Sequence, residues 1–133
     1  MKKHSKVLIA LAVIASMFTV TAYAKDIKFS ITKSDGATAI TTNTKDRTQN
    51  SWLITNSDTS YSNFIAGEDV IGFRVRNTSK TAMSSYHTFT NFVKNYALPY
   101  TKTPTQGQTL VLWSQIDSTG DYSIINFEGK WFT

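Results

Sequence analysis

Two arginines separated by one residue are the feature of this sequence that points to a ligand. Arg74 and Arg76 lie in "DVIGFRVRN", where apolar residues alternate with other types. If residues 71–76 form a regular strand, both guanidinium groups project from one face, about 7 Å apart. Because each guanidinium offers a planar fork of donors, such a pair can grip a phosphate or a carboxylate. The simpler interpretation is the solvated outer face of an antiparallel sheet, which produces the same alternation.

Other groups that perform chemistry are few and lack a supporting pattern. His87 is the only histidine outside the first 24 residues, and the chain contains no cysteine. A Ser–His–Asp triad needs each member held by its neighbour, and no Gly-x-Ser-x-Gly elbow occurs. A zinc site needs three or four nitrogen, sulfur or oxygen ligands. The acids Glu68, Asp69, Asp121 and Glu128 occupy ordinary positions beside turns and strands. We therefore expect no catalytic residue, no metal site and no cofactor.

The first 24 residues have the pattern of a secretory signal peptide. Three lysines precede an apolar run at residues 7–20, and Ala22 and Ala24 fit the small-x-small cleavage rule. We expect cleavage between Ala24 and Lys25. The alternative is a membrane anchor, but the apolar run is short for a span of about 20 residues. The mature chain would then be one domain, residues 25–133, secreted to the extracellular space without a membrane span.

Composition narrows the class of protein further. Loss of the three leader lysines lowers the formal net charge of +5 by three, which removes any case for nucleic-acid binding. Without cysteines, the secreted chain must be held by its core alone, and its length is sufficient for that. A cysteine-free secreted protein is typical of Gram-positive bacteria, and we expect such a source.

Alternation of period two predicts an all-β fold with about seven or eight short strands. The expected strands are 27–31, 38–42, 51–55, 69–77, 82–93, 109–116 and 122–132. Turn signals at Asp35-Gly36 and at 117–121 predict two hairpins, and residues 98–108 form a connection. Among the expected strands, the stretch 85–93 is the one where a helical turn is the alternative. No helical crossover separates the strands, so the pattern favours a small antiparallel β-sandwich preceded by the signal-peptide helix.

The last expected strand carries large aromatic residues close to the end of the sequence. Ile125, Phe127, Gly129 and Trp131 share one of its faces. Apolar residues occur on both faces, which fits either a strand covered on both sides or a strand whose phase is switched by a bulge, for which Gly129 is a suitable position. We expect Trp131 to lie in the core or at its rim, because a large aromatic at the end of a sandwich strand usually packs inward. The alternative is an exposed aromatic patch for a ligand.

Several short stretches also carry a family resemblance. They are the leader, the strand "IKFSI", the Lys-Asp-Arg stretch before "SWLIT", the central "GFRVRN" and the closing "FEGKW". In these the chain resembles a family of small exported, cysteine-free proteins of Gram-positive bacteria, known as a domain of unknown function. The resemblance implies export and a small β fold. It implies no activity and no catalytic residues.

These observations favour a secreted, non-enzymatic β-sandwich that binds a cell-envelope or extracellular ligand. Its partner would be an anionic wall polymer or a carbohydrate, gripped by Arg74 and Arg76. Tyrosines that lie exposed would add stacking on sugars, and the candidates are Tyr61, Tyr86, Tyr96 and Tyr100. The alternative is a bacteriocin-like antimicrobial or toxin, because the chain is small, exported and mildly basic. No strongly amphipathic cationic helix supports that alternative.

The leader makes a direct prediction about the mature N-terminus. Protein recovered from the culture medium of a secreting bacterial host should begin at Lys25, because a signal peptidase reads the small residues before that bond. Intact mass spectrometry measures this. Recovery of a secreted product that retains residues 1–24 would contradict it.

Overall fold

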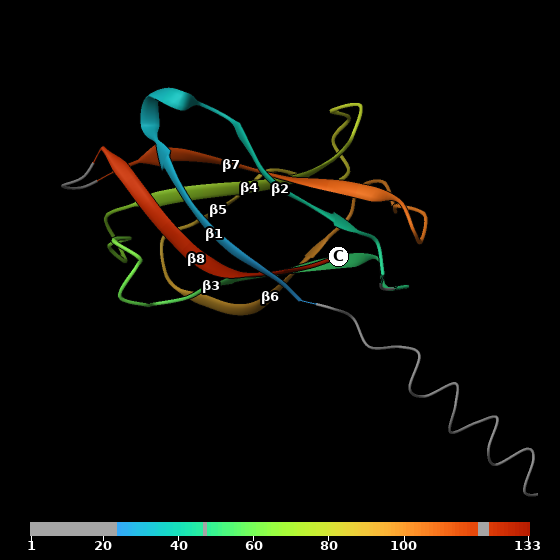
Figure 1. Ribbon diagram of the computed structural model, residues 1–133, viewed down its shortest axis with the longest axis horizontal. Helices are drawn as coiled ribbons and strands as arrows, with labels where there is room; N and C mark the ends of the chain where they lie inside the picture. The colour runs from blue at the N-terminus through green and yellow to red at the C-terminus, as the bar shows by residue number, and fades with distance from the viewer. Residues whose placement is uncertain (1–23, 47, 120–122) are drawn as a thin grey trace, which may run out of the picture.

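The structure is a sandwich of two four-stranded antiparallel sheets. The computed structural model describes residues 24–46, 48–119 and 123–133. One sheet has the order β1-β8-β3-β6 and the other β2-β7-β4-β5, and Figure 1 shows them as two layers. The elements are β1 (Lys25–Thr32), the 3-10 turn η1 (Lys33–Asp35), β2 (Thr38–Thr44), β3 (Ser51–Asn56), β4 (Val70–Asn77), β5 (His87–Phe89), β6 (Val93–Pro99), β7 (Thr109–Ser118) and β8 (Ile124–Phe132). The predicted all-β sandwich is confirmed.

The leader is not part of this description. Apart from Ala24, the predicted signal peptide lies outside the described residues. Within the part of the chain that is described, no helix has the length and apolar character needed to cross a membrane.

Both predicted hairpins are wrong, because the chain changes sheet at these turns. β1 pairs with β8 and β2 pairs with β7, so the strands on either side of Asp35-Gly36 never meet as a hairpin. Gly36 has a φ of 65° and follows the 3-10 turn, a left-handed conformation that glycine adopts without steric cost. β7 and β8 likewise belong to different sheets. A turn signal reports a local reversal of the chain, but it does not say which strand the next segment will join.

The inward faces of the strands meet in an aromatic and aliphatic core. In β4 the predicted inward residues Ile71, Phe73 and Val75 are all fully buried. The Phe73 ring lies 5.1 Å from that of Phe127, which joins the two sheets across the core. Trp52 and Ile54 of β3 and Ile125 and Trp131 of β8 are fully buried as well. Trp131 is therefore part of the core, as expected.

Gly129 permits a close approach of two strands, and the bulge predicted there is wrong. The register of β1 against β8 runs without a shift, with Ile27 opposite Gly129. A Cβ atom at Gly129 would lie 1.8 Å from the backbone oxygen of Thr55 on β3. No side chain fits at that separation, so the glycine is required by packing and not by a change of strand phase.

The segment before β7 differs most from the sequence prediction. No helical turn occurs within 85–93, where β5 is a short strand instead. β6 occupies part of the stretch expected to be a connection and ends at Pro99. Its pairing with β3 shifts register between Ile54 and Asn56, and Asn95 has a φ of 48°. This bulge interrupts the alternation, which explains why the sequence pattern did not show β6 as a strand.

The two adjacent aromatics near the end of the sequence should differ sharply in their effect on stability. Trp131 is fully buried, whereas Phe132 is partly exposed on the outer face. Trp131→Ala should lower the free energy of unfolding by about 3–5 kcal/mol, because it leaves a large cavity. The matched control Phe132→Ala should cost about 1–2 kcal/mol. Urea denaturation measures both, and equal losses would show that Trp131 is not a core residue.

Candidate anion-binding site

Arg74 and Arg76 project from the outer face of β4, as the alternation predicted. Both side chains are half-buried. In the register of β4 against the neighbouring strand β7, Arg74 lies opposite Trp113 and Arg76 opposite Val111. The two arginines therefore share their face of the sheet with an outward tryptophan.

Each guanidinium lies against an aromatic ring. The Cζ atom of Arg76 lies 5.0 Å from the Trp113 ring centroid, and that of Arg74 lies 5.8 Å from the Tyr86 ring centroid. Both distances are within the range of cation–π attraction. The Nη1 atom of Arg76 also donates a hydrogen bond of 3.1 Å to the backbone oxygen of Lys80. These contacts fix the direction of both guanidinium groups.

Gly72 makes room for the Tyr86 ring. Gly72 precedes Arg74 and Arg76 on the same outer face of β4, and Tyr86 comes from the segment that leads into β5. A Cβ atom at Gly72 would lie 1.9 Å from the Tyr86 hydroxyl oxygen and 2.1 Å from its ring carbon Cζ. The ring thus occupies the space that any side chain at position 72 would need. On the outer face of β4, Gly72 therefore supports the Tyr86 ring, and the two cations Arg74 and Arg76 follow it along the strand.

Several donor atoms of the site have no acceptor within hydrogen-bond distance in the described residues. The Nε atoms of Arg74 and Arg76, the Nε1 atom of Trp113 and the hydroxyl of Tyr86 are buried and lack a hydrogen-bond partner among the described residues. Nor does either guanidinium form an ion pair with a carboxylate in that part of the chain. These four residues, together with Ala37, Ser114 and Gln115, line a pocket of about 220 Å³. A cluster dominated by donors is complementary to an anion.

The pKa of the Tyr86 hydroxyl is shifted by burial and by two charged neighbours, Asp117 and Arg74. Burial raises the pKa of the Tyr86 hydroxyl far above its ordinary value, the nearby Asp117 carboxylate raises it further, and Arg74 acts in the opposite direction. No hydrogen bond of normal geometry joins Tyr86 to Asp117. Tyr86 therefore stays a neutral phenol under ordinary conditions, and the positive charge of the pocket comes from the two arginines.

The other candidate residues are not gathered into a site. The His87 ring lies 4.8 Å from that of Phe89 and 5.5 Å from that of Tyr96. Glu128 accepts a 2.6 Å hydrogen bond from the Thr59 hydroxyl, and Asp121 lies outside the described residues. In residues 24–46, 48–119 and 123–133, no three histidine or acidic side chains come together as metal ligands would.

Of the four tyrosines considered for stacking, only Tyr86 joins the arginines. Lys28 lies over the Tyr61 ring at 4.3 Å, and Tyr100 is buried. Sequence reasoning did not assign a role to Trp113. The signal was present, because in "TLVLWSQI" the buried residues Leu110 and Leu112 fix the inward phase and leave Trp113 on the outward phase. A tryptophan side chain on the outward, polar face of a strand is expected to be covered either by other residues of the protein or by a ligand.

Comparison with known proteins gives no match: no protein-family model, no curated protein and no solved structure is significantly similar to the chain. The resemblance drawn from the short motifs stays a prediction, and the site is interpreted from its own geometry.

Tyrosine titration tests the packing of Tyr86 on Gly72. With a raised pKa, folded Tyr86 should stay protonated where exposed tyrosines ionise, near pH 10. Tyr86→Phe should leave the 295 nm phenolate absorbance of the folded protein unchanged up to about pH 11, but remove one tyrosinate from the chain unfolded in denaturant.

The sign of the linked stability effect follows from the same shift. Above about pH 10 the unfolded chain loses a proton that the folded protein keeps, so stability should fall as pH rises, and less so in Tyr86→Phe. Gly72→Ala should push the ring outward and restore ionisation closer to pH 10. A Gly72→Ala protein with an unchanged titration would show that Tyr86 does not rest on Gly72.

Proposed function

We propose that this protein is a secreted, non-enzymatic β-sandwich that binds an anionic group of a cell-envelope polymer through Arg74 and Arg76. The observation that carries the proposal is that Arg74, Arg76 and Trp113 line one pocket and each has a buried donor without a hydrogen-bond partner among the described residues. A phosphate or carboxylate supplies acceptors for several of them at once.

The size of the pocket favours a charged group on a larger molecule. Its volume of about 220 Å³ is below the roughly 300–1,000 Å³ that is typical of pockets enclosing a whole small molecule. A phosphate or a sugar carboxylate fits such a space, while the rest of the ligand lies along the outer face of the β2-β7-β4-β5 sheet. A repeating anionic polymer presents many such groups in a row.

The aromatic partners support this assignment in a second way. The Trp113 and Tyr86 rings hold the guanidinium groups by cation–π contact, so the arginines lose less side-chain freedom when they bind an anion. Arginine is suited to this role because its planar donors match the oxygens of phosphate and carboxylate. Export through the leader would bring the site to the polymers outside the cell.

Substitution of the two arginines tests the proposal. Poly(glycerol phosphate) serves as the probe, with binding measured by calorimetry at low salt. Arg74→Gln and Arg76→Gln should each weaken binding by about tenfold or more, because each removes a charge-assisted hydrogen bond. The affinity of the unaltered protein should also fall as salt is added.

A charge-matched variant provides the control. Lys33→Gln/Lys102→Gln removes two exposed positive charges outside the site and should change the affinity little. The arginine double variant Arg74→Gln/Arg76→Gln removes the same number of charges. If it and Lys33→Gln/Lys102→Gln weaken binding equally, the attraction is general and not specific to the site. Dye release from anionic vesicles would instead favour the antimicrobial alternative.

A further inference from the structure

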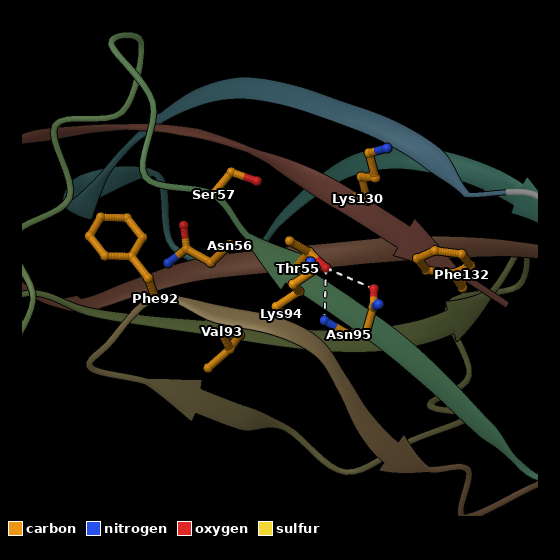
Figure 2. Close-up of a pocket in the computed structure, with 9 residues that line it drawn as sticks. All are labelled: Thr55, Asn56, Ser57, Phe92, Val93, Lys94, Asn95, Lys130 and Phe132. Carbon is orange, nitrogen blue, oxygen red and sulfur yellow. Dashed lines mark hydrogen bonds between the residues drawn. The ribbon is translucent and has the colours of Figure 1, made fainter.

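A second and larger pocket lies on the other sheet. It has a volume of about 500 Å³ and is formed where the end of β3 meets β6 and β8. Figure 2 shows its side chains, with Thr55 near the centre, Phe92 on one side and Phe132 on the other. Neither arginine of the candidate anion-binding site contributes to it. The volume falls within the range of pockets that enclose a small molecule.

The register of the strands turns three side chains outward at this pocket. Thr55 of β3 lies opposite Lys130 of β8, and Phe132 follows two residues later on β8. The adjacent residues Ile54 and Trp131 are fully buried. The period of two therefore directs Thr55, Lys130 and Phe132 to the outer face. Because an aromatic side chain reaches a diagonal neighbour on a paired strand, Phe132 and Thr55 border the same space.

The bulge in β6 fixes Asn95 against Thr55. Asn95 adopts a φ of 48°, and its backbone nitrogen donates a 2.9 Å hydrogen bond to the Thr55 hydroxyl oxygen. The Thr55 hydroxyl in turn donates to the Asn95 side-chain oxygen at 3.2 Å, as the dashed lines in Figure 2 show. A non-glycine residue in this conformation needs such local support, and residues of this kind concentrate at functional sites.

These two hydrogen bonds leave an acceptor and a donor close together. The Thr55 hydroxyl has given its only hydrogen to Asn95, so its oxygen can only accept a further hydrogen bond. The Asn95 amide nitrogen, in the same planar group as the oxygen that Thr55 uses, donates to no other described residue. A hydroxyl group both donates and accepts. Two neighbouring hydroxyls on a ligand therefore match this pair, whereas a carboxylate, which only accepts, does not.

The Phe132 ring supplies an apolar surface beside these polar groups. It lies on the outer face and is partly exposed, and Val93 adds to the apolar wall of the pocket. A sugar in its pyranose form combines neighbouring hydroxyls with a face of C–H groups. Such a face packs on an aromatic ring, because the face of the ring carries negative partial charge. The pocket thus presents the two kinds of surface that a sugar ring carries.

We propose that this pocket binds a pyranose sugar through two neighbouring hydroxyl groups. One ligand hydroxyl accepts from the Asn95 amide nitrogen, and its neighbour donates to the Thr55 oxygen. The C–H face of the sugar packs on Phe132. The ammonium group of Lys130 is available to a further hydroxyl, because its 4.0 Å ion pair with Asp26 is long and largely exposed. All four protein side chains are exposed or partly exposed, so the sugar reaches them without displacing the core.

The experiment follows the side-chain amide signals of Asn95 by NMR while sugar is added to the unaltered protein. Glucose, mannose and galactose serve as probes, because together they present neighbouring hydroxyls in both trans and cis arrangements. At least one of them should shift these signals in a saturable manner. Cyclohexanol, a ring with a single hydroxyl, should produce a much smaller shift. Absence of a shift with all three sugars, or an equal shift with cyclohexanol, overturns the proposal.

The same chemistry occurs in a free sugar and in one residue of a polysaccharide, and a trisaccharide of the sugar that binds distinguishes these sources. Tighter binding of the trisaccharide assigns the pocket to a polysaccharide. Equal or weaker binding assigns it to a free sugar.

Variants separate this role from a structural one. Asn95→Gly keeps a residue suited to positive φ and the backbone hydrogen bond to Thr55, but it removes the amide donor. Phe132→Leu keeps an apolar side chain and removes the flat ring. Each should weaken sugar binding at least about tenfold, followed through the backbone amide signal of Thr55, while the thermal midpoint changes by only a few degrees. Full binding by either folded variant would overturn the proposal.

The arginine site provides a test of independence. Arg74→Gln/Arg76→Gln should leave sugar binding unchanged, because both arginines lie on the outer face of the opposite sheet. Loss of sugar binding in this variant would contradict the placement of the sugar at Asn95. Failure of the sugar proposal leaves the binding of an anionic polymer by the arginines unaffected.

Discussion

The alternation of β4 is the constraint from which both the core and the candidate anion-binding site follow. Ile71, Phe73 and Val75 are fully buried between the sheets, and the period of two then sends Arg74 and Arg76 outward. A slip of one residue would bury both guanidinium groups, at a cost on the order of several kcal/mol per ion. The burial that stabilises the sandwich therefore also fixes where the arginines lie.

The contacts within the arginine site offset only part of the free-energy cost of burying its hydrogen-bond donors. The cation–π contacts of Arg74 with Tyr86 and of Arg76 with Trp113 contribute about 0.5–1 kcal/mol for each pair at exposed sites. A buried donor without a partner costs about 1–3 kcal/mol, and three donors of the pocket, on Arg74, Arg76 and Trp113, have no partner in the described part of the chain. The aromatic contacts thus orient the guanidinium groups without satisfying them, and the remaining donors favour an acceptor from outside the chain. Any ligand that supplies it stabilises the folded state by mass action.

The fold class and the inward faces could be predicted because they depend on local alternation. The residues of β4, and Trp131 in β8, lie on the faces that their phase indicated. The pairing of strands could not be predicted in this way. β2 leaves β1 for the opposite sheet after Gly36, and a turn residue carries no information about a partner strand distant in the sequence. β6 escaped detection because its bulge at Asn95 breaks the period.

The same distinction applies to the candidate site. Arg74 and Arg76 were predicted from one strand, but their aromatic partners come from elsewhere in the chain. Trp113 reaches the site through the pairing of β4 with β7, and Tyr86 through a segment outside any strand. The glycine at position 72 is explained only by the ring that lies over it. Sequence alternation therefore locates the charges, while long-range pairing determines what surrounds them.

The arginine pocket, and the pocket formed where β3 meets β6 and β8, each lie beside a break in strand register, which gives these two a common structural origin. The pairing of β2 with β7 shifts just after Ala39, the residue opposite Trp113, and the pairing of β3 with β6 shifts between Ile54 and Asn56. Regular antiparallel strands present a smooth pleated face, whereas a bulge bends one strand and turns its side chains to new directions. These two pockets therefore lie where regular pairing fails. The core, built from uninterrupted inward rows, supplies the rigid support that lets those irregular edges hold a fixed shape.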